Sequence, residues 1–170
     1  MRILLIATNR HNRLQSRMNA QPLPIGLAYI AGHINQDRHV LKVLDLMFSG
    51  DDYLDTVEST VRDFQPDLVG ISLRNLSNHS YLDTQWALPI TKNVVDRIRE
   101  NTKAPVVCGG PAFSILPKEC FEYLGVDLGL AGDAGETFSE LADRIEIGEP
   151  SYHNLPGLVY REDSKVSFNG

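Results

Sequence analysis

Short apolar runs recur along the chain at intervals of 20 to 40 residues. The run Ile3–Ala7 is continuous and apolar, which is typical of a strand covered on both faces in a parallel sheet. Similar runs follow at 40–46, 67–72, 105–108 and 126–131. This pattern predicts five buried strands.

Between these runs, apolar side chains recur at intervals of three and four residues. Such stripes predict five amphipathic helices. Pro22 and Pro24 precede the first predicted helix. Proline is tolerated at a helix start because the first N–H groups have no partner within the helix. Asp133 and Glu136 have the spacing of a capping box at the start of the last predicted helix. The stripes are Leu23/Leu27/Ile30/Ile34, Leu54/Val57/Val61/Phe64, Ile90/Val94/Ile98, Cys120/Phe121/Leu124 and Phe138/Leu141/Ala142/Ile145.

Strict alternation of strands and helices predicts an α/β fold, a doubly wound parallel sheet with helices on both faces. We expect the flavodoxin-like strand order 2-1-3-4-5. In such sheets ligands bind at the carboxyl ends of the strands, near the switch point between strands 1 and 3. With 170 residues, the chain is long enough for one domain with a sizeable core.

Composition narrows the classes of partner. The net charge of −6 and the absence of any basic run argue against nucleic acid, which needs clustered Lys and Arg. The opening apolar run is too short for a signal-peptide core or a membrane span, so we expect a cytoplasmic protein with no membrane partner. Cys108 and Cys120 form no CxxC pair, so we expect buried, reduced thiols.

Four loops at the predicted carboxyl edge of the sheet carry small or amide side chains: 8–13, 72–78, 108–111 and 131–136. The loop after strand 3 offers hydroxyls, two amides and a guanidinium, and it contains no carboxylate before Asp83. It is therefore suited to binding a ligand more than to gaining or losing protons.

Two small pairs stand out in these loops. Gly109–Gly110 admits close approach of a flat ligand to the backbone, or it makes a tight turn. Ala131–Gly132 adds a second small pair on the next strand end, and two such pairs suggest a slot beside the sheet. Arg74 is either a solvated charge or a recognition group, and we favour recognition. For Glu136 we favour helix capping over ligand contact.

Four motifs in this order and spacing resemble the amino-terminal cobalamin-binding domain of B12-dependent radical-SAM enzymes. They are Pro24–Ala31 (PIGLAYIA), Val69–Asn75 (VGISLRN), Gly109–Pro111 (GGP) and Gly132–Glu136 (GDAGE). Asn154–Arg161 resembles the segment that leads into the catalytic barrel of these enzymes, so the resemblance covers nearly the whole chain.

The resemblance implies that a corrin ring lies over the strand ends and that its dimethylbenzimidazole nucleotide tail enters the slot. Residues 72–75 would hydrogen-bond the tail, Gly109 and Gly110 would leave room for it, and Ala131–Gly132 would line the other side. A buried tail needs glycine walls and a few neutral polar anchors. The expected cofactor contacts are Thr8, Asn9, Ser72, Leu73, Arg74, Asn75, Gly109, Gly110, Pro111, Ala131, Gly132 and Glu136.

The chain departs from one motif of other cobalamin domains. The methionine synthase and mutase types supply a lower cobalt ligand from Asp-x-His-x-x-Gly after strand 1, whereas residues 9–14 here read NRHNRL. His11 lacks the carboxylate that would orient its imidazole, so we expect a solvent-facing His11 and a cobalt without a protein ligand. Ligation by His11 is the alternative.

A second departure concerns catalysis. The cluster motif Cys-x-x-x-Cys-x-x-Cys is absent, and two cysteines cannot hold a [4Fe–4S] cluster. We expect residues 1–150 to form the cobalamin-binding domain and 151–170 a linker or hairpin toward a radical-SAM domain downstream in the same polypeptide. That domain would hold the cluster and S-adenosylmethionine and use the corrin for methyl transfer. The chain alone is then a cofactor-binding module.

Other proteins share the predicted topology. A receiver domain needs acidic residues after strand 1 and an aspartate at the end of strand 3, where this chain has Asn9 and Ser72. A flavodoxin needs a glycine-rich phosphate loop after strand 1, and a dinucleotide-binding fold needs the motif G-x-G-x-x-G there. Residues 8–13 contain no glycine, which argues against both classes. The strongest alternative is a non-catalytic interaction or ligand-sensing domain that binds no corrin.

Overall fold

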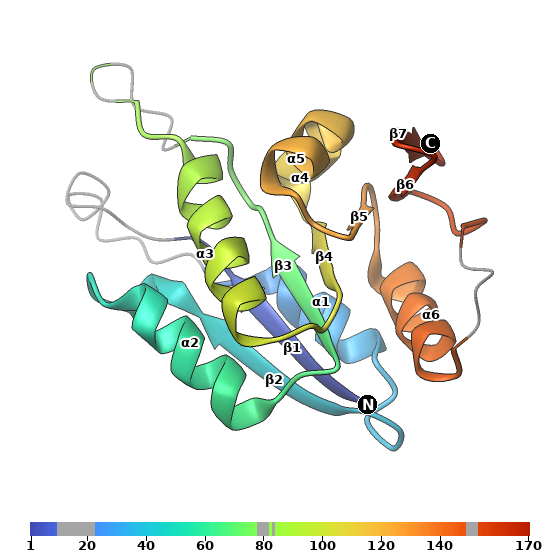
Figure 1. Cartoon of the computed structure of the whole chain (residues 1–170), viewed down its shortest axis with the longest axis horizontal. Helices are drawn as coiled ribbons and strands as arrows, with labels where there is room; N and C mark the ends of the chain where they lie inside the picture. The colour runs from blue at the N-terminus through green and yellow to red at the C-terminus, as the bar shows by residue number, and fades with distance from the viewer. Residues whose placement is uncertain (10–22, 78–81, 83, 149–152) are drawn as a thin grey trace.

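The computed structural model describes residues 1–9, 23–77, 82, 84–148 and 153–170. Within them, the central sheet has the strand order β2-β1-β3-β4-β5-β6-β7 (Figure 1). The first five strands pair in parallel, which confirms the flavodoxin-like α/β prediction and its order 2-1-3-4-5. These strands are β1 (Arg2–Ala7), β2 (Val40–Asp45), β3 (Leu68–Ser72), β4 (Val106–Gly109) and β5 (Leu128–Leu130).

The sheet is wider than the five predicted strands. An antiparallel hairpin of β6 (Leu158–Glu162) and β7 (Lys165–Phe168) continues it beyond β5, with Leu158 opposite Leu130. The two turn residues, Asp163 and Ser164, have φ angles of 46° and 69°, as two-residue hairpin turns require. The sequence predicted a linker or hairpin at 151–170 but not the pairing of this hairpin with β5. That pairing joins two segments far apart in the chain, and no local sequence pattern specifies it.

Helices cover both faces of the sheet. α1 (Ile25–His33) and α6 (Gly135–Glu146) pack on one face. The other face carries α2, α3, α4 and α5. Their bounds are Tyr53–Phe64, Ala87–Asn101, Pro111–Ile115 and Pro117–Leu124, and one 3₁₀ turn (Leu46–Phe48) follows β2.

Strand β1 shows how one apolar run serves two cores. Successive side chains of a strand point to opposite faces. Leu4 and Ile6 therefore join the core under α2, α3 and α5, while Ile3 and Leu5 join the core under α1 and α6. Every one of these side chains is fully buried, which explains the continuous apolar pattern.

Two helix starts differ from the prediction. α4 was not predicted, because its five residues, which begin at Pro111, are too few to show a stripe. The predicted capping box is wrong: the residue before the first turn of α6 is Ala134, and Asp133 lies one position earlier. The Asp133 carboxylate instead accepts a hydrogen bond of 3.4 Å from the Gly135 N–H.

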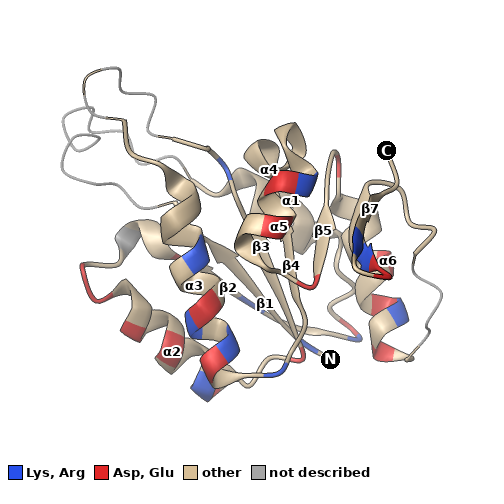
Figure 2. Cartoon of the chain, turned by 45° about the horizontal axis from the view of Figure 1, so that its top comes forward, with Lys and Arg blue, Asp and Glu red and all other residues tan. Residues whose placement is uncertain are grey.

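Charged residues of both signs lie along α2, α3, α5 and α6 (Figure 2). Ion pairs four residues apart join Glu58 to Arg62 on α2, Lys92 to Asp96 on α3 and Glu140 to Arg144 on α6. Exposed pairs of this kind contribute little stability each. None of the described helices has the length and apolar character needed to cross a bilayer.

Candidate functional site

A cavity of about 230 Å³ lies at the carboxyl ends of the central strands, on the face covered by α1 and α6. This is the edge where doubly wound sheets bind ligands. The lining comes from four strands, from α1, α4 and α6 and from the loops after β4 and β5: Leu5, Gly26, Leu27, Tyr29, Ile30, Gly70, Ile71, Ser72, Val107, Gly109, Gly110, Pro111, Ser114, Leu130, Gly132, Asp133, Ala134 and Phe138.

Gly110 makes a tight junction between the loops after β3 and β4. Its φ angle is 105°, a conformation that side chains rarely adopt. A Cβ at this position would lie 2.7 Å from the backbone oxygen of Leu73. Leu73 in turn donates its N–H to the oxygen of Gly109 at 2.8 Å. The glycine is therefore required by the close packing of two backbones, which holds the cavity wall in place.

The Ser114 hydroxyl joins the two small-residue loops. It donates to the Gly110 oxygen at 3.0 Å and accepts the Gly132 N–H at 2.9 Å. Ser114 lies one turn into α4, so this helix carries the bridging group to the cavity edge. The bridge fixes the spacing between the loops after β4 and β5.

Glycines also shape the inner end of the cavity. A Cβ at Gly70 would lie 2.7 Å from the Leu5 side chain and 3.1 Å from the Phe138 ring. The missing side chain lets the ring approach the sheet. At Gly26 and Gly132, by contrast, an added Cβ would meet nothing within 4 Å. Both of these positions open onto free space beside the cavity.

Tyr29 and Asp133 lie at the side of the cavity facing solvent. The Tyr29 hydroxyl donates to the Asp133 carboxylate at 3.4 Å, and its ring lies 4.4 Å from that of His33. Partial removal from water and the adjacent carboxylate raise the pKa of Tyr29. The phenol therefore keeps its proton at neutral pH and acts as a hydrogen-bond donor.

Five of the expected contact residues line the cavity together: Ser72, Gly109, Gly110, Pro111 and Gly132. They come from the ends of β3, β4 and β5, which are separated in sequence and adjacent in the sheet. The Ser72 hydroxyl faces the cavity and makes no hydrogen bond with any residue that the structure describes. It is a polar group available to a ligand.

Seven other expected residues lie outside the described cavity lining: Thr8, Asn9, Leu73, Arg74, Asn75, Ala131 and Glu136. Thr8 is 3% exposed, and its hydroxyl bonds to the Ser72 oxygen and to Thr91. Leu73 is a core residue, and Ala131 donates its N–H to Gly157. Asn9, Arg74 and Asn75 are half-buried, and Glu136 is exposed. His11 lies outside the described residues.

Sequence reasoning did not assign a site role to α1 or to Phe138. Gly26, Leu27, Tyr29 and Ile30 contribute one side of the cavity. The one available signal was the PIGLAYIA motif, which contains all four residues but shows only an amphipathic helix start. Which face of that helix covers the strand ends is set by tertiary packing.

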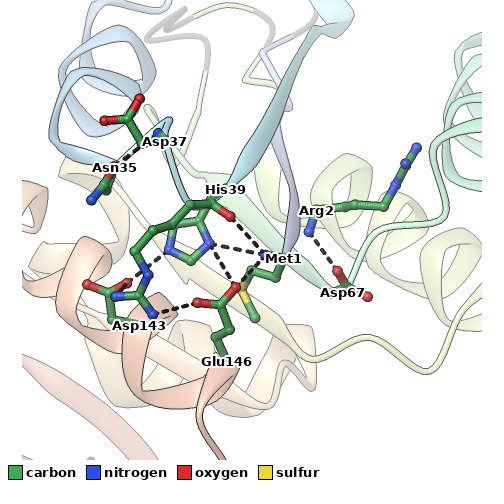
Figure 3. Close-up of polar contacts among 9 residues, drawn as sticks. Met1, Arg2, Asn35, Asp37, His39, Asp67, Asp143 and Glu146 are labelled. Atoms are coloured by element: carbon green, nitrogen blue, oxygen red, sulfur yellow. Dashed lines mark hydrogen bonds and ion pairs between the residues drawn. The ribbon is translucent and has the colours of Figure 1, made fainter.

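A polar cluster lies at the amino ends of the strands, away from the cavity (Figure 3). His39 Nε2 lies 3.0 Å from Asp143 Oδ1, and Glu146 pairs with Arg38 and with the Met1 amino group, each at 2.6 Å. His39, Asp143 and Glu146 are close enough to suit a metal ion. Protein cations already neutralise both carboxylates, so the cluster serves to attach α6 to the sheet.

The two cysteines are free and buried, as expected. Burial is the main cause that raises the pKa of the Cys108 thiol, and it also raises the pKa of Cys120. Neither sulfur forms the thiolate needed for nucleophilic or metal chemistry at neutral pH.

Comparison with known families assigns this architecture. Residues 18–142 match the family described as the B12 binding domain, which covers most of the chain. The chain belongs to the B12-binding domain family. It is thereby a cobalamin-binding domain, as the sequence motifs predicted.

Its relatives include cobalamin-dependent radical-SAM enzymes. A tryptophan 2-C-methyltransferase of Streptomyces laurentii is 34% identical over 118 residues, which cover 69% of this chain and 20% of the relative. The radical S-adenosylmethionine methyltransferase TsrM of Kitasatospora setae, solved with cobalamin and a [4Fe–4S] cluster, superposes with a TM-score of 0.87 at 26% identity. The match covers 99% of this chain and 28% of TsrM.

A more distant structure has the same fold. The cobalamin-dependent S-adenosylmethionine radical enzyme OxsB, solved with aqua-cobalamin, gives a TM-score of 0.73 at 16% identity, over 99% of this chain and 22% of OxsB. The chain thus spans between a fifth and three tenths of the length of these relatives.

Proposed function

We propose that this domain binds cobalamin with its nucleotide tail in the carboxyl-edge cavity and presents the corrin to a radical-SAM domain of the same polypeptide for methyl transfer. The observation that carries the proposal is the cavity itself, which opens at the strand ends in a domain of the B12-binding family. TsrM, which has the same fold over nearly this whole chain, holds cobalamin and a [4Fe–4S] cluster.

The residues present fit a buried aromatic tail. A dry apolar cavity of roughly 150 Å³ holds a benzene ring, so the 230 Å³ found here has room for a bicyclic ring. Gly110 and Gly132 would give the tail a wall without side chains, and the Ser72 hydroxyl would hydrogen-bond it. The wall beneath the tail would come from apolar residues of β1, β3, β4 and β5.

The part played by this chain is binding and shielding. Bound cobalamin would supply the methyl-transfer chemistry of its cobalt. The described residues of the cavity would hold the tail away from water and fix the position of the ring above the strand ends. Whether His11 contacts the cobalt lies outside the described residues, and we propose that it does not, because no carboxylate precedes it at the Asp-x-His spacing.

Corrin retention tests the binding half of the proposal. Purified chain is mixed with hydroxocobalamin and desalted, and the visible absorbance of bound corrin is recorded. The substitution Gly26→Trp fills space beside the cavity and is expected to weaken binding by at least about tenfold. Gly32→Trp is the matched control, because Gly32 lies on the same helix, is equally open and is outside the cavity lining.

Two results would contradict this half. If the unmodified chain retains no corrin, the alternative of a non-catalytic interaction domain gains support. If Gly26→Trp binds as well as Gly32→Trp, the tail does not use this cavity. The partner half is tested by reading the coding sequence beyond Gly170 for Cys-x-x-x-Cys-x-x-Cys, and a continuing reading frame without it would contradict the presence of a radical-SAM domain.

A further inference from the structure

The inner wall of the cavity is apolar on every side that the structure describes. Side chains from three strands and two helices meet there: Leu5, Leu27, Val107, Leu130 and Phe138. Each of these is at most 5% exposed. A ring that enters the cavity therefore leaves water for a surface without polar side chains.

Several backbone polar groups along this wall are already bonded to other parts of the protein. The Gly109 oxygen accepts the Leu73 N–H at 2.8 Å, and the Gly110 oxygen accepts the N–H and the hydroxyl of Ser114, each at 3.0 Å. The Gly132 N–H is bonded to the Ser114 hydroxyl. These contacts hold the two glycine loops together.

Few polar partners then remain among the described lining residues. The Ser72 hydroxyl is available, at the end of β3. Tyr29 and Asp133 bond to one another and lie toward solvent, with Tyr29 47% exposed. Among the side chains of the described lining, one hydroxyl is therefore left to bind a polar atom of a buried ring.

An apolar wall with one available side-chain hydroxyl favours some of the lower bases that corrinoid nucleotides carry over others. A methylated benzimidazole attached to its ribose has one remaining ring nitrogen, which a single hydroxyl can satisfy. An attached adenine has several ring nitrogens and an amino group. Each polar group that is buried without a partner weakens binding by roughly tenfold, since unmade hydrogen bonds cost about 1–3 kcal/mol and 1.4 kcal/mol is a factor of ten.

We propose that this cavity selects corrinoids with an apolar lower base of the benzimidazole type and rejects those with a purine. The inference rests on the proposed function, because it requires that the nucleotide tail occupy the cavity. The determinants are the apolar wall around Val107 and Leu130 and the single available hydroxyl of Ser72.

Three corrinoids distinguish the possibilities when each is titrated into the purified chain and followed by visible absorbance. Cobalamin carries dimethylbenzimidazole, an adeninyl cobamide carries adenine, and cobinamide carries no nucleotide. We expect cobalamin to bind tightest and the adeninyl cobamide at least about tenfold more weakly. Cobinamide should also bind more weakly, because it leaves the cavity unfilled.

The outcomes separate the two proposals. If none of the three corrinoids binds, the proposed function fails. If cobalamin and the adeninyl cobamide bind equally while both outbind cobinamide, the tail is bound but the selectivity is overturned. Equal binding of cobalamin and cobinamide would also overturn it, because the tail would then contribute nothing.

A pair of substitutions on one strand tests the cause of the selectivity. Val107→Thr adds a hydroxyl to the cavity wall with little change of shape and is expected to narrow the ratio between the two cobamides. Val106→Thr is the matched control: Val106 is equally buried, faces the opposite core and lies outside the cavity lining. An unchanged ratio in Val107→Thr, or an equal change in both variants, would overturn the proposed role of the wall.

Discussion

Individual glycines hold the cavity loops in place for two different physical reasons. Gly110 is needed both for its φ of 105° and for the contact of its backbone with Leu73. Gly132 has a φ of 85° but open space around it, so its backbone conformation alone excludes a side chain. Gly110 thus meets a packing and a conformational requirement, whereas Gly132 meets the conformational requirement alone.

Gly110→Ala is expected to lower the free energy of unfolding by more than about 2 kcal/mol, because the new Cβ meets a backbone oxygen in a conformation that already costs 1–3 kcal/mol for a side chain. Urea unfolding followed by circular dichroism measures the change. Gly32→Ala is the control, since its added Cβ meets nothing within 4 Å and favours the helix. Equal stability of the two variants would rule out the packing role of Gly110.

Among the elements, the hairpin β6–β7 extends the sheet through a very close backbone contact. Gly157, just before β6, accepts the Ala131 N–H at 2.9 Å through its oxygen. An added Cβ at Gly157 would lie 2.3 Å from the Ala131 oxygen. The hairpin therefore stands directly against the loop after β5, whose next residue, Gly132, lines the cavity.

Gly157→Ala is expected to loosen the hairpin from β5 and to destabilise the chain more than Gly148→Ala does. The two glycines have nearly equal φ angles, 71° and 68°, but an added Cβ at Gly148 meets nothing within 4 Å. The difference between the variants therefore isolates the contact with Ala131, and we expect it to be on the order of 1–3 kcal/mol. Thermal unfolding measures it, and equal melting temperatures would argue against this docking.

Across the whole molecule, the two ends of the sheet have different tasks. The carboxyl edge carries the cavity, and the amino edge carries the polar cluster of Figure 3 that attaches α6 to the starts of β1 and β2. The Met1 amino group, through a hydrogen bond, and Arg38 hold the pKa of the Glu146 carboxyl below its usual range, against a smaller effect of burial.

This lowered pKa predicts how stability depends on pH. A carboxyl whose pKa is lower in the folded state stabilises the fold above its unfolded pKa, and this contribution is lost as the pH falls through the folded value. We expect Glu146→Gln to lower the melting temperature at pH 7 and to differ less from the unmodified chain below about pH 4. A difference in melting temperature that stays constant from pH 7 to below pH 4 would contradict the stabilising role of the ionised Glu146 carboxylate.

Glu140→Gln provides the comparison for this experiment. Glu140 lies on the same helix, is half exposed and pairs with Arg144 four residues away. Exposed pairs of this type contribute about 0–1 kcal/mol, so the melting temperature should change little at either pH. If Glu140→Gln lowers the melting temperature more than Glu146→Gln does, the polar cluster at the amino edge does not stabilise the fold more than an ordinary exposed ion pair.

The sequence by itself determined the five strands and most helices, because strand and helix periodicities are local properties of a chain. The parallel pairing and the strand order were predicted from the strict alternation of strands and helices, which is typical of doubly wound sheets. It also determined the edge at which the cavity lies, since Ser72, Gly109, Gly110 and Gly132 all lie at or just after the carboxyl ends of neighbouring strands. The motifs around these residues were enough to identify the B12-binding family.

Tertiary structure alone decided the rest. The pairing of the hairpin with β5, the placement of Tyr29 and Gly26 over the strand ends and the approach of Phe138 to Gly70 join residues far apart in sequence. The same is true of Thr8, whose hydroxyl is used by Thr91 and Ser72 and so is not available at the surface. Such contacts depend on how helices pack on the sheet, and no local pattern of side chains specifies that packing.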